Sequence, residues 1–192
     1  MNKIKISFNS PVVLWFSIIC FAALLLNTVT GGLANMAVFS IFKTSWSDIL
    51  MYPRLILHVF GHADWSHFMG NIMLILILGP LLEEKYGSIN MVVVILTTAI
   101  ATGLFNIIIF PNVRLLGASG VVFAFILLSS ITRLKDGTIP LTFILVAVIY
   151  IGGEILSGIT LNDNVSNITH IIGGLVGASM GFAFGSRKNR RK

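Results

Sequence analysis

The segment RLLGASGVVFAFILLSS, residues 114–130, places a serine at the start of a strongly apolar run. Ser119 stands between small residues in GASG, so its hydroxyl is unhindered, whereas the run that follows is suited to lipid. A polar group at membrane depth is costly and is by default a candidate for a functional site. The rest of the chain has to explain why a serine stands there.

The composition predicts that lipid is the solvent for most of the chain. Of 192 residues, 56% are hydrophobic and only 10% are charged, against about 25% charged in a soluble domain. The single cysteine, Cys20, excludes an internal disulfide and a cysteine-based metal cage. We expect no cofactor and no metal.

Six apolar stretches approach the roughly 20 residues that a membrane-crossing helix needs. They lie near residues 11–33, 67–84, 89–110, 117–133, 139–157 and 168–185. The first is too long, and too polar at its end, for a signal peptide, so we interpret it as a retained helix. The sequence therefore predicts an all-α membrane protein: a short N-terminus at 1–10, one six-helix bundle at 11–186 and a basic tail at 187–192.

The basic residues predict the orientation of this bundle. Six crossings put both termini on one side, and ten of the 13 Lys and Arg residues then fall on that side. By the positive-inside rule, both termini are cytoplasmic. Five basic residues crowd the tail, RKNRRK, which indicates orientation in a bilayer rather than nucleic-acid binding, and we expect no nucleic-acid partner.

The longest connection, residues 34–66, lies on the outer side and is rich in aromatic residues, so we expect it to sit partly in the membrane interface. Arg54 is interpreted as structural, and Glu83 and Glu84 as capping or pairing at the inner end of the second helix. His58 and His62 are four residues apart, but they lack the glutamate of the H-E-x-x-H zinc pattern, so no metal role is predicted.

The polar residues of three helices fall at the same depth. In this topology the helices near 67–84, 117–133 and 168–185 all begin on the outer side. His67 and Asn71 lie in the first turns of the second helix, and Ser119 and His170 lie in the first turns of the fourth and sixth. We therefore expect one polar cluster near the outer face.

A glycine stripe follows His170 in HIIGGLVGASMG, residues 170–181. Gly173 and Gly177 recur on the face of the helix that carries His170, and such a stripe lets another helix approach closely in lipid. If the partner is the helix that begins at GASG, with Gly117 and Gly120, His170 meets Ser119 within hydrogen-bond reach.

A serine beside a histidine base is typical of nucleophilic acyl chemistry. Such chemistry also needs donors for an oxyanion, and His67, Asn71 and the backbone N–H of Ser119 are the candidates. No aspartate occupies a comparable outer helix end. We therefore predict a Ser–His dyad and not a triad.

Together these residues resemble the rhomboid family of intramembrane serine proteases. HFMGN (67–71), GASG (117–120) and HIIGGLVG (170–177) match the family's H-x-x-x-N, G-x-S-G and H-x-x-G-x-x-x-G motifs, in order and on the expected helices. RLILHVFGHADWSH (54–67) and EEKYGS (83–88) look like the family's stretches that enter and close the second helix. The resemblance covers about residues 50–185.

The resemblance implies that Ser119 is the nucleophile, His170 the general base, and His67, Asn71 and the Ser119 amide the oxyanion hole. It implies hydrolysis of peptide bonds in or near the transmembrane segments of membrane-protein substrates, with the site near the outer face. The minimal helix set suggests a prokaryotic cell membrane. Two residues depart from common family patterns: Thr169, often alanine, and Phe123, tyrosine in some members.

Two other functions compete with this interpretation. A catalytically inactive rhomboid-like protein would bind transmembrane clients without cutting them, but such relatives usually lack the serine or the histidine. A small transporter or channel would place its polar groups near the membrane midplane, whereas here they gather at one end.

Overall fold

The computed structural model describes residues 9–131, 139–161 and 164–189. Within these ranges the chain is helical, apart from turns, loops and one isolated antiparallel bridge between Ile41 and Leu115. The helices are α1 (Pro11–Val29), α2 (Leu33–Ala37), α3 (Met51–Leu57), the 3-10 turn η1 (His58–Phe60), α4 (Trp65–Tyr86), α5 (Ser88–Ile109), α6 (Ser119–Ser130), α7 (Leu141–Leu161) and α8 (Asn164–Asn189). Most of the predicted N-terminus at 1–10, and residues 190–192 of the predicted tail at 187–192, lie outside the described ranges.

Among the described residues, four helices are long and apolar enough to cross a membrane: α1, α4, α5 and the 167–184 part of α8. Helix α6 and the 141–153 part of α7 are apolar but shorter. The all-α membrane fold is therefore confirmed for the described residues. The number of crossings, six, stays a prediction.

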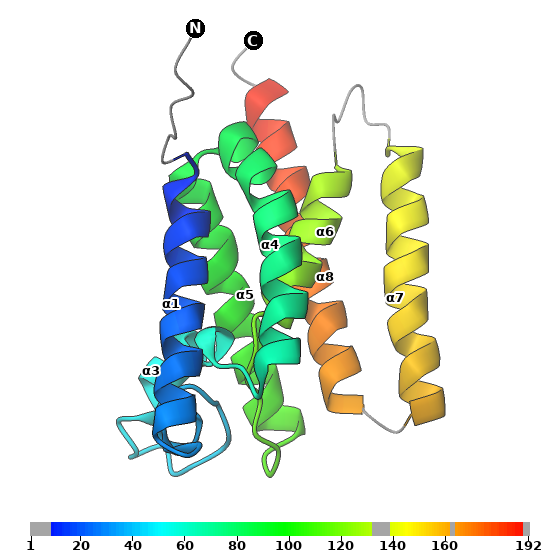
Figure 1. Ribbon diagram of the computed structural model, residues 1–192. Helices are drawn as coiled ribbons and strands as arrows, with labels where there is room; N and C mark the ends of the chain where they lie inside the picture. The colour runs from blue at the N-terminus through cyan, green and yellow to red at the C-terminus, as the bar shows by residue number, and fades with distance from the viewer. Residues whose placement is uncertain (1–8, 132–138, 162–163, 190–192) are drawn as a thin grey trace, which may run out of the picture.

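Helix α6 lies in the interior of the bundle, with α8, α4, α5 and α7 around it (Figure 1). Helices α4, α6 and α8 run in one direction, and α1, α5 and α7 run in the other (Figure 1). The α6 helix has 12 residues, or about 18 Å, against about 30 Å of hydrocarbon. Its first residue, Ser119, therefore lies inside the bundle, and residues 110–118 run inward to reach it.

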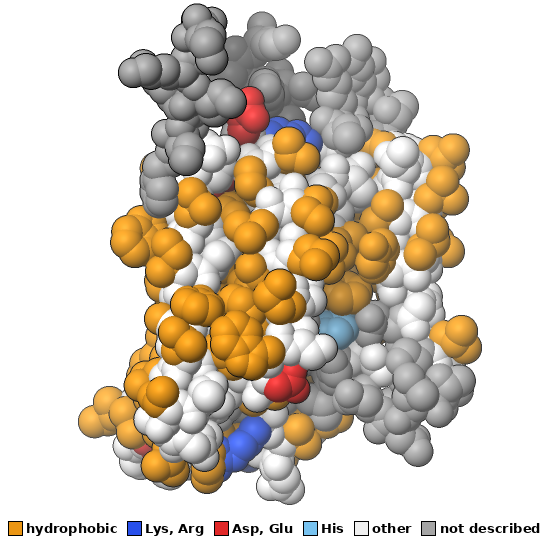
Figure 2. Space-filling view, in the orientation of Figure 1, with side chains coloured by type: hydrophobic (Ala, Val, Ile, Leu, Met, Phe, Trp, Pro, Cys, Tyr) orange, Lys and Arg blue, Asp and Glu red, His pale blue; other side chains and the backbone are white. Residues whose placement is uncertain are grey.

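The surface supports a lipid environment. Hydrophobic side chains cover the middle of the face in Figure 2, and charged side chains gather toward its two ends. Large apolar side chains are openly exposed, Ile89 at 81% and Val148 at 65%. An exposed apolar surface of this extent is unusual for a soluble monomer and is expected for a protein embedded in lipid.

The contact between α6 and α8 is the most extensive between any two helices of the described chain. A Cβ added at Gly173 would collide with the backbone of Gly120, and one added at Gly177 would collide with the backbone of Ala124. The glycine stripe therefore brings two helix backbones into direct contact, as the sequence pattern predicts.

Several helix ends differ from the sequence-based expectation. Helices α7 and α8 each end about four residues later than expected, at Leu161 and Asn189. The first helix, expected at 11–33, ends at Val29 because Gly31 and Gly32 adopt positive φ angles of 61° and 95°. The fourth, expected at 117–133, begins only at Ser119, since Gly117 has φ 123°. The sixth, expected at 168–185, begins by Asn164, because no glycine or proline interrupts residues 164–170. His170 consequently lies about two turns into α8 and not in its first turn.

Two ionisable side chains hold the framework together. Arg54 is 7% exposed. It donates to the carbonyl of Ala37 at 2.9 Å and pairs with Asp48 at 3.5 Å, which fixes the connection between α1 and α4. Glu83 accepts hydrogen bonds from the backbone N–H groups of Val12 and Val13 at 3.1 and 3.0 Å. It is a cap, as expected, but for α1 and not for its own helix.

Candidate active site

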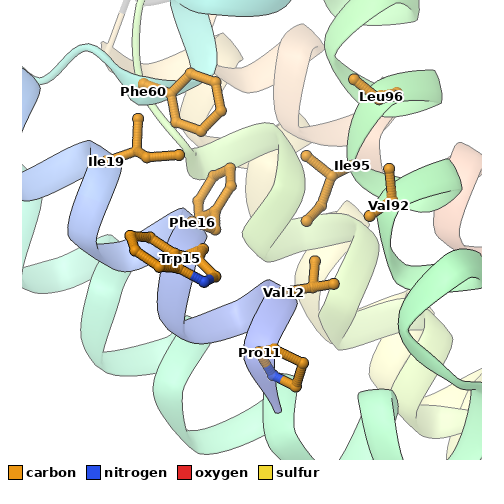
Figure 3. A pocket seen from close by; sticks show the side chains of 9 residues that line it. All are labelled: Pro11, Val12, Trp15, Phe16, Ile19, Phe60, Val92, Ile95 and Leu96. Atoms are coloured by element: carbon orange, nitrogen blue, oxygen red, sulfur yellow. The ribbon is translucent and has the colours of Figure 1, made fainter.

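Of two hollows in the described chain, one is lined only by apolar side chains and the other by polar ones as well. The first, of about 290 Å³, lies between α1 and α5 (Figure 3) and is lined by apolar side chains. Its residues are Pro11, Val12, Trp15, Phe16, Ile19, Phe60, Val92, Ile95 and Leu96. It contains no nucleophile and no titratable group, so it is not a candidate for catalysis.

The second hollow, of about 480 Å³, brings together the residues that the sequence analysis singled out. It is lined by Ala63, Ser66, His67, Gly70, Asn71, Val113, Arg114, Leu115, Leu116, Ser119, Thr169 and His170. These residues come from the start of α4, the connection before α6, the start of α6 and the second turn of α8. We refer to this hollow as the polar pocket.

Ser119 occupies the first position of α6. The backbone before it turns at Gly117, whose φ of 123° is unfavourable for any residue with a side chain. The N–H of Gly117 donates to the carbonyl of His58 at 2.9 Å, which ties the turn to η1. As the first helical residue, Ser119 has a backbone N–H without a partner in its own helix, and the helix dipole adds partial positive charge there.

His170 is held by ring stacking. Its imidazole lies parallel to the ring of Phe123, with 4.4 Å between the centroids and 7° between the planes. Phe123 is one turn after Ser119 on α6, so the stacked pair connects α8 to the helix that carries the serine. The ring of Tyr150 on α7 packs nearly at right angles to the ring of Phe123, with 5.9 Å between the centroids.

His67 and Asn71 are positioned by the start of α4. Asp64 is the N-cap of this helix, and its carboxylate accepts the backbone N–H of His67 at 2.8 Å. One turn later, Asn71 is 7% exposed, and its Nδ2 is buried without a hydrogen-bond partner in the described part of the chain. A buried amide donor without a partner is costly unless something else supplies the acceptor.

The predicted helix-packing glycines have two different roles. Gly120, Gly173 and Gly177 lie at the α6–α8 contact. Gly117 instead lies in the turn before α6. A Cβ at Gly117 would lie 2.8 Å from Cε1 and Nε2 of His67, so the missing side chain makes room for that ring.

Two histidines that the sequence analysis left without a role lie directly behind the polar pocket. The ring of His62 is fully buried and packs edge-to-face on His67, with 5.1 Å between centroids. His58 is also buried, and its Nε2–H donates to the carbonyl of Ala99 at 3.0 Å. The sequence carried one signal of this cluster, because His58, His62 and His67 fall within ten residues.

Burial keeps both of these histidines neutral. It lowers the pKa of His58 to about 4. Burial, together with the neighbouring His67, also lowers the pKa of His62 to about 4. In the described residues, no group of three His, Cys, Asp or Glu side chains is arranged to hold a metal ion.

The fold and the pocket define a helical integral membrane protein with a serine and a histidine in one cavity. A family model for the rhomboid domain matches residues 50–187, which is most of the chain, so the protein belongs to the rhomboid family.

Two curated relatives are similar at low identity. Rhomboid-like protein 11, chloroplastic, of Arabidopsis thaliana is 28% identical over 133 residues, which cover 62% of this chain and 47% of that protein. Rhomboid protease GlpG of Yersinia pseudotuberculosis serotype I is 24% identical over 176 residues, which cover 90% of this chain and 62% of that protein. The chain thus spans about half to three fifths of the length of these relatives.

Proposed function

We propose that this protein is an intramembrane serine endopeptidase that hydrolyses peptide bonds in or near the transmembrane segments of other membrane proteins. The observation that carries the proposal is the polar pocket, which Ser119 and His170 share with the side chains of His67 and Asn71. Similarity to a protein named as a rhomboid protease supports the same chemistry.

In the proposed reaction, His170 takes the proton of the Ser119 hydroxyl as the oxygen attacks the scissile carbonyl. His170 then gives this proton to the leaving amine, and water hydrolyses the acyl-enzyme with the same histidine as base. Among the described residues that line the pocket there is no Asp or Glu. The ring of Phe123, stacked on the imidazole, is proposed to help orient it.

The oxyanion of the tetrahedral intermediate needs donors that are already in place. The N–H of Ser119, the Nδ2 of Asn71 and the ring of His67 are proposed for this role. Asn71 supports it best, because its buried amide donor has no partner in the described chain and gains one when the oxyanion forms.

We further propose six membrane crossings with both termini in the cytoplasm, in a prokaryotic cell membrane. Helices α4, α6 and α8 then begin toward the outer face, from which water enters the polar pocket. The substrates are transmembrane proteins, and a substrate helix has to unwind locally, because helical carbonyls are shielded by their own hydrogen bonds.

A serine-directed fluorophosphonate probe tests the proposal on purified protein in detergent. We expect labelling of the wild type and none of Ser119→Ala or His170→Ala. Ser129→Ala is the matched control, since Ser129 is on the same helix but donates to its own backbone at Ile126. If correctly folded wild type does not label, the proposal is wrong, and a client-binding protein without catalysis takes its place.

A further inference from the structure

Arg114 is the one Lys, Arg, Asp or Glu residue among the described residues that line the polar pocket. The site so far assigned needs no fixed charge: its nucleophile, base and donors are all present without Arg114. The arginine is nevertheless exposed at the pocket, five residues before the serine. Its surroundings indicate what it can bind.

The backbone on both sides of Arg114 is held firmly. Leu115 exchanges two backbone hydrogen bonds with Ile41, each of 2.9 Å. The carbonyl of Val113 accepts from the side-chain amide of Asn106 at 2.9 Å. The guanidinium therefore extends from a fixed segment and not from a freely moving loop.

The guanidinium itself is also oriented. One of its nitrogens donates to the carbonyl of Met36 at 3.2 Å, and its central carbon lies 4.2 Å from the centroid of the Phe42 ring. An arginine has five N–H donors, so most of them are left for another acceptor. A planar, pre-oriented guanidinium matches a carboxylate with two parallel hydrogen bonds.

A comparison with Arg54 shows that Arg114 lacks a counter-charge. Both cations lie over the ring of Phe42, Arg54 at 5.0 Å. Arg54 is buried and paired with Asp48, so its charge is neutralised within the protein. Arg114 is exposed, and no carboxylate pairs with it in the part of the chain that the structure describes.

We propose that Arg114 is a specificity-determining residue, which binds the carboxylate of an Asp or Glu side chain that a substrate carries close to the cleaved bond. This inference rests on the proposed function and names a feature of its substrates. Phosphate groups of lipids have the same chemistry, but Arg114 lines the cavity that holds Ser119, which is where a substrate chain has to enter.

The test compares transmembrane substrates that carry Glu, Gln or Lys in turn at several positions on either side of the cleaved bond. Wild type is expected to cut the best Glu substrate with a kcat/KM about five- to tenfold above that of its Gln counterpart. Arg114→Gln removes this preference, and Arg114→Glu reverses it in favour of Lys. Lys43→Gln, which removes an exposed charge from the neighbouring connection but not from the pocket, keeps the preference of the wild type.

Binding to the Ser119→Ala variant is measured in parallel with fluorescent Glu and Gln peptides, so that an acid preference is detected even if nothing is cut. Absence of cleavage and of probe labelling, with tighter binding of the Glu peptide, would contradict the proposed function but not the role of Arg114. Equal use of Glu and Gln substrates by an active wild type would overturn the role of Arg114. So would a dependence on Arg114 that appears only in vesicles of anionic lipid, which would assign the arginine to headgroups.

Discussion

The α6–α8 contact and the polar pocket lie side by side, yet they are built on opposite principles. At the contact, Gly173 and Gly177 lie directly against the backbone of Gly120 and Ala124, and the α6 residues Val121, Ala124 and Phe125 are at most 1% exposed. In the pocket, Asn71 keeps a buried donor without a partner in the described chain. A tightly packed helix contact can thus lie beside a site that keeps a buried polar donor unsatisfied.

The largest effect that separates the two regions is expected from Asn71→Ala. Removing one oxyanion donor typically lowers kcat by about 100- to 1000-fold. Because the amide donor has no partner in the described chain, its loss should cost little stability. Turnover of a transmembrane substrate and thermal unfolding in detergent measure the two effects. A large loss of stability with kcat preserved would assign Asn71 to the framework.

Gly177→Ala is expected to disrupt the α6–α8 contact. The new Cβ would collide with the backbone of Ala124, which cannot move aside as a flexible side chain can. Overpacking of this kind costs about 1–3 kcal/mol, so we expect a lower unfolding temperature. Gly174→Ala is the matched control, since its Cβ would only touch the side chain of Leu127 at 3.5 Å. Equal stability of the two variants would contradict the close approach.

Acid pH tests the buried neutral histidines His58 and His62. The pKa of His58 is lowered to about 4 in the folded protein, against about 6.5 in an unfolded chain. The unfolded state therefore binds more protons between these values, and stability falls as the pH drops below about 6.5. At pH 5, one such histidine lowers the free energy of unfolding by about 2 kcal/mol.

The pH effect is measured by chemical unfolding at pH 8 and pH 5. In His58→Gln, which has no titrating group at this position, the difference between the two pH values should shrink. An unchanged difference would show that other groups cause the acid sensitivity.

The smallest effect is expected at His170, which lines the pocket and stacks on a side chain of α6. Phe123→Leu keeps an apolar side chain but removes the ring that stacks on the imidazole. An aromatic pair contributes about 0.5–1.5 kcal/mol beyond its buried area, so kcat should fall by about two- to tenfold. Phe123→Tyr keeps the stack and should stay close to wild type. A Leu variant as active as the Tyr variant would show that stacking does not orient the base.

Much of this arrangement could be predicted from the sequence, because it depends on spacing along single helices. Gly173 and Gly177 lie one turn apart, and the structure places both against α6 as that spacing predicts. His67 and Asn71 are likewise one turn apart and reach the same pocket. The roles assigned to these two residues and to Ser119 and His170 stay predictions.

The parts that could not be predicted depend on contacts between distant segments. The turn at Gly117 leaves room for His67, which comes from another helix. His62 packs behind His67, and Arg114 lies over Phe42, which is far away in the sequence. Neither hydropathy nor helical periodicity carries information about such pairs. The early start of α8 was missed for a different reason, since the polar residues 164–167 do not look like a membrane helix.

The cap that Glu83 provides for α1 has a consequence for biosynthesis. The N–H groups of Val12 and Val13 receive their acceptor from a residue 70 or more positions later in the chain. During translation, α1 leaves the ribosome before α4, so these amides lack the Glu83 acceptor until the end of α4 has been made. These two hydrogen bonds of α1 can thus form only when α4 is complete, and a chain truncated before residue 83 lacks them.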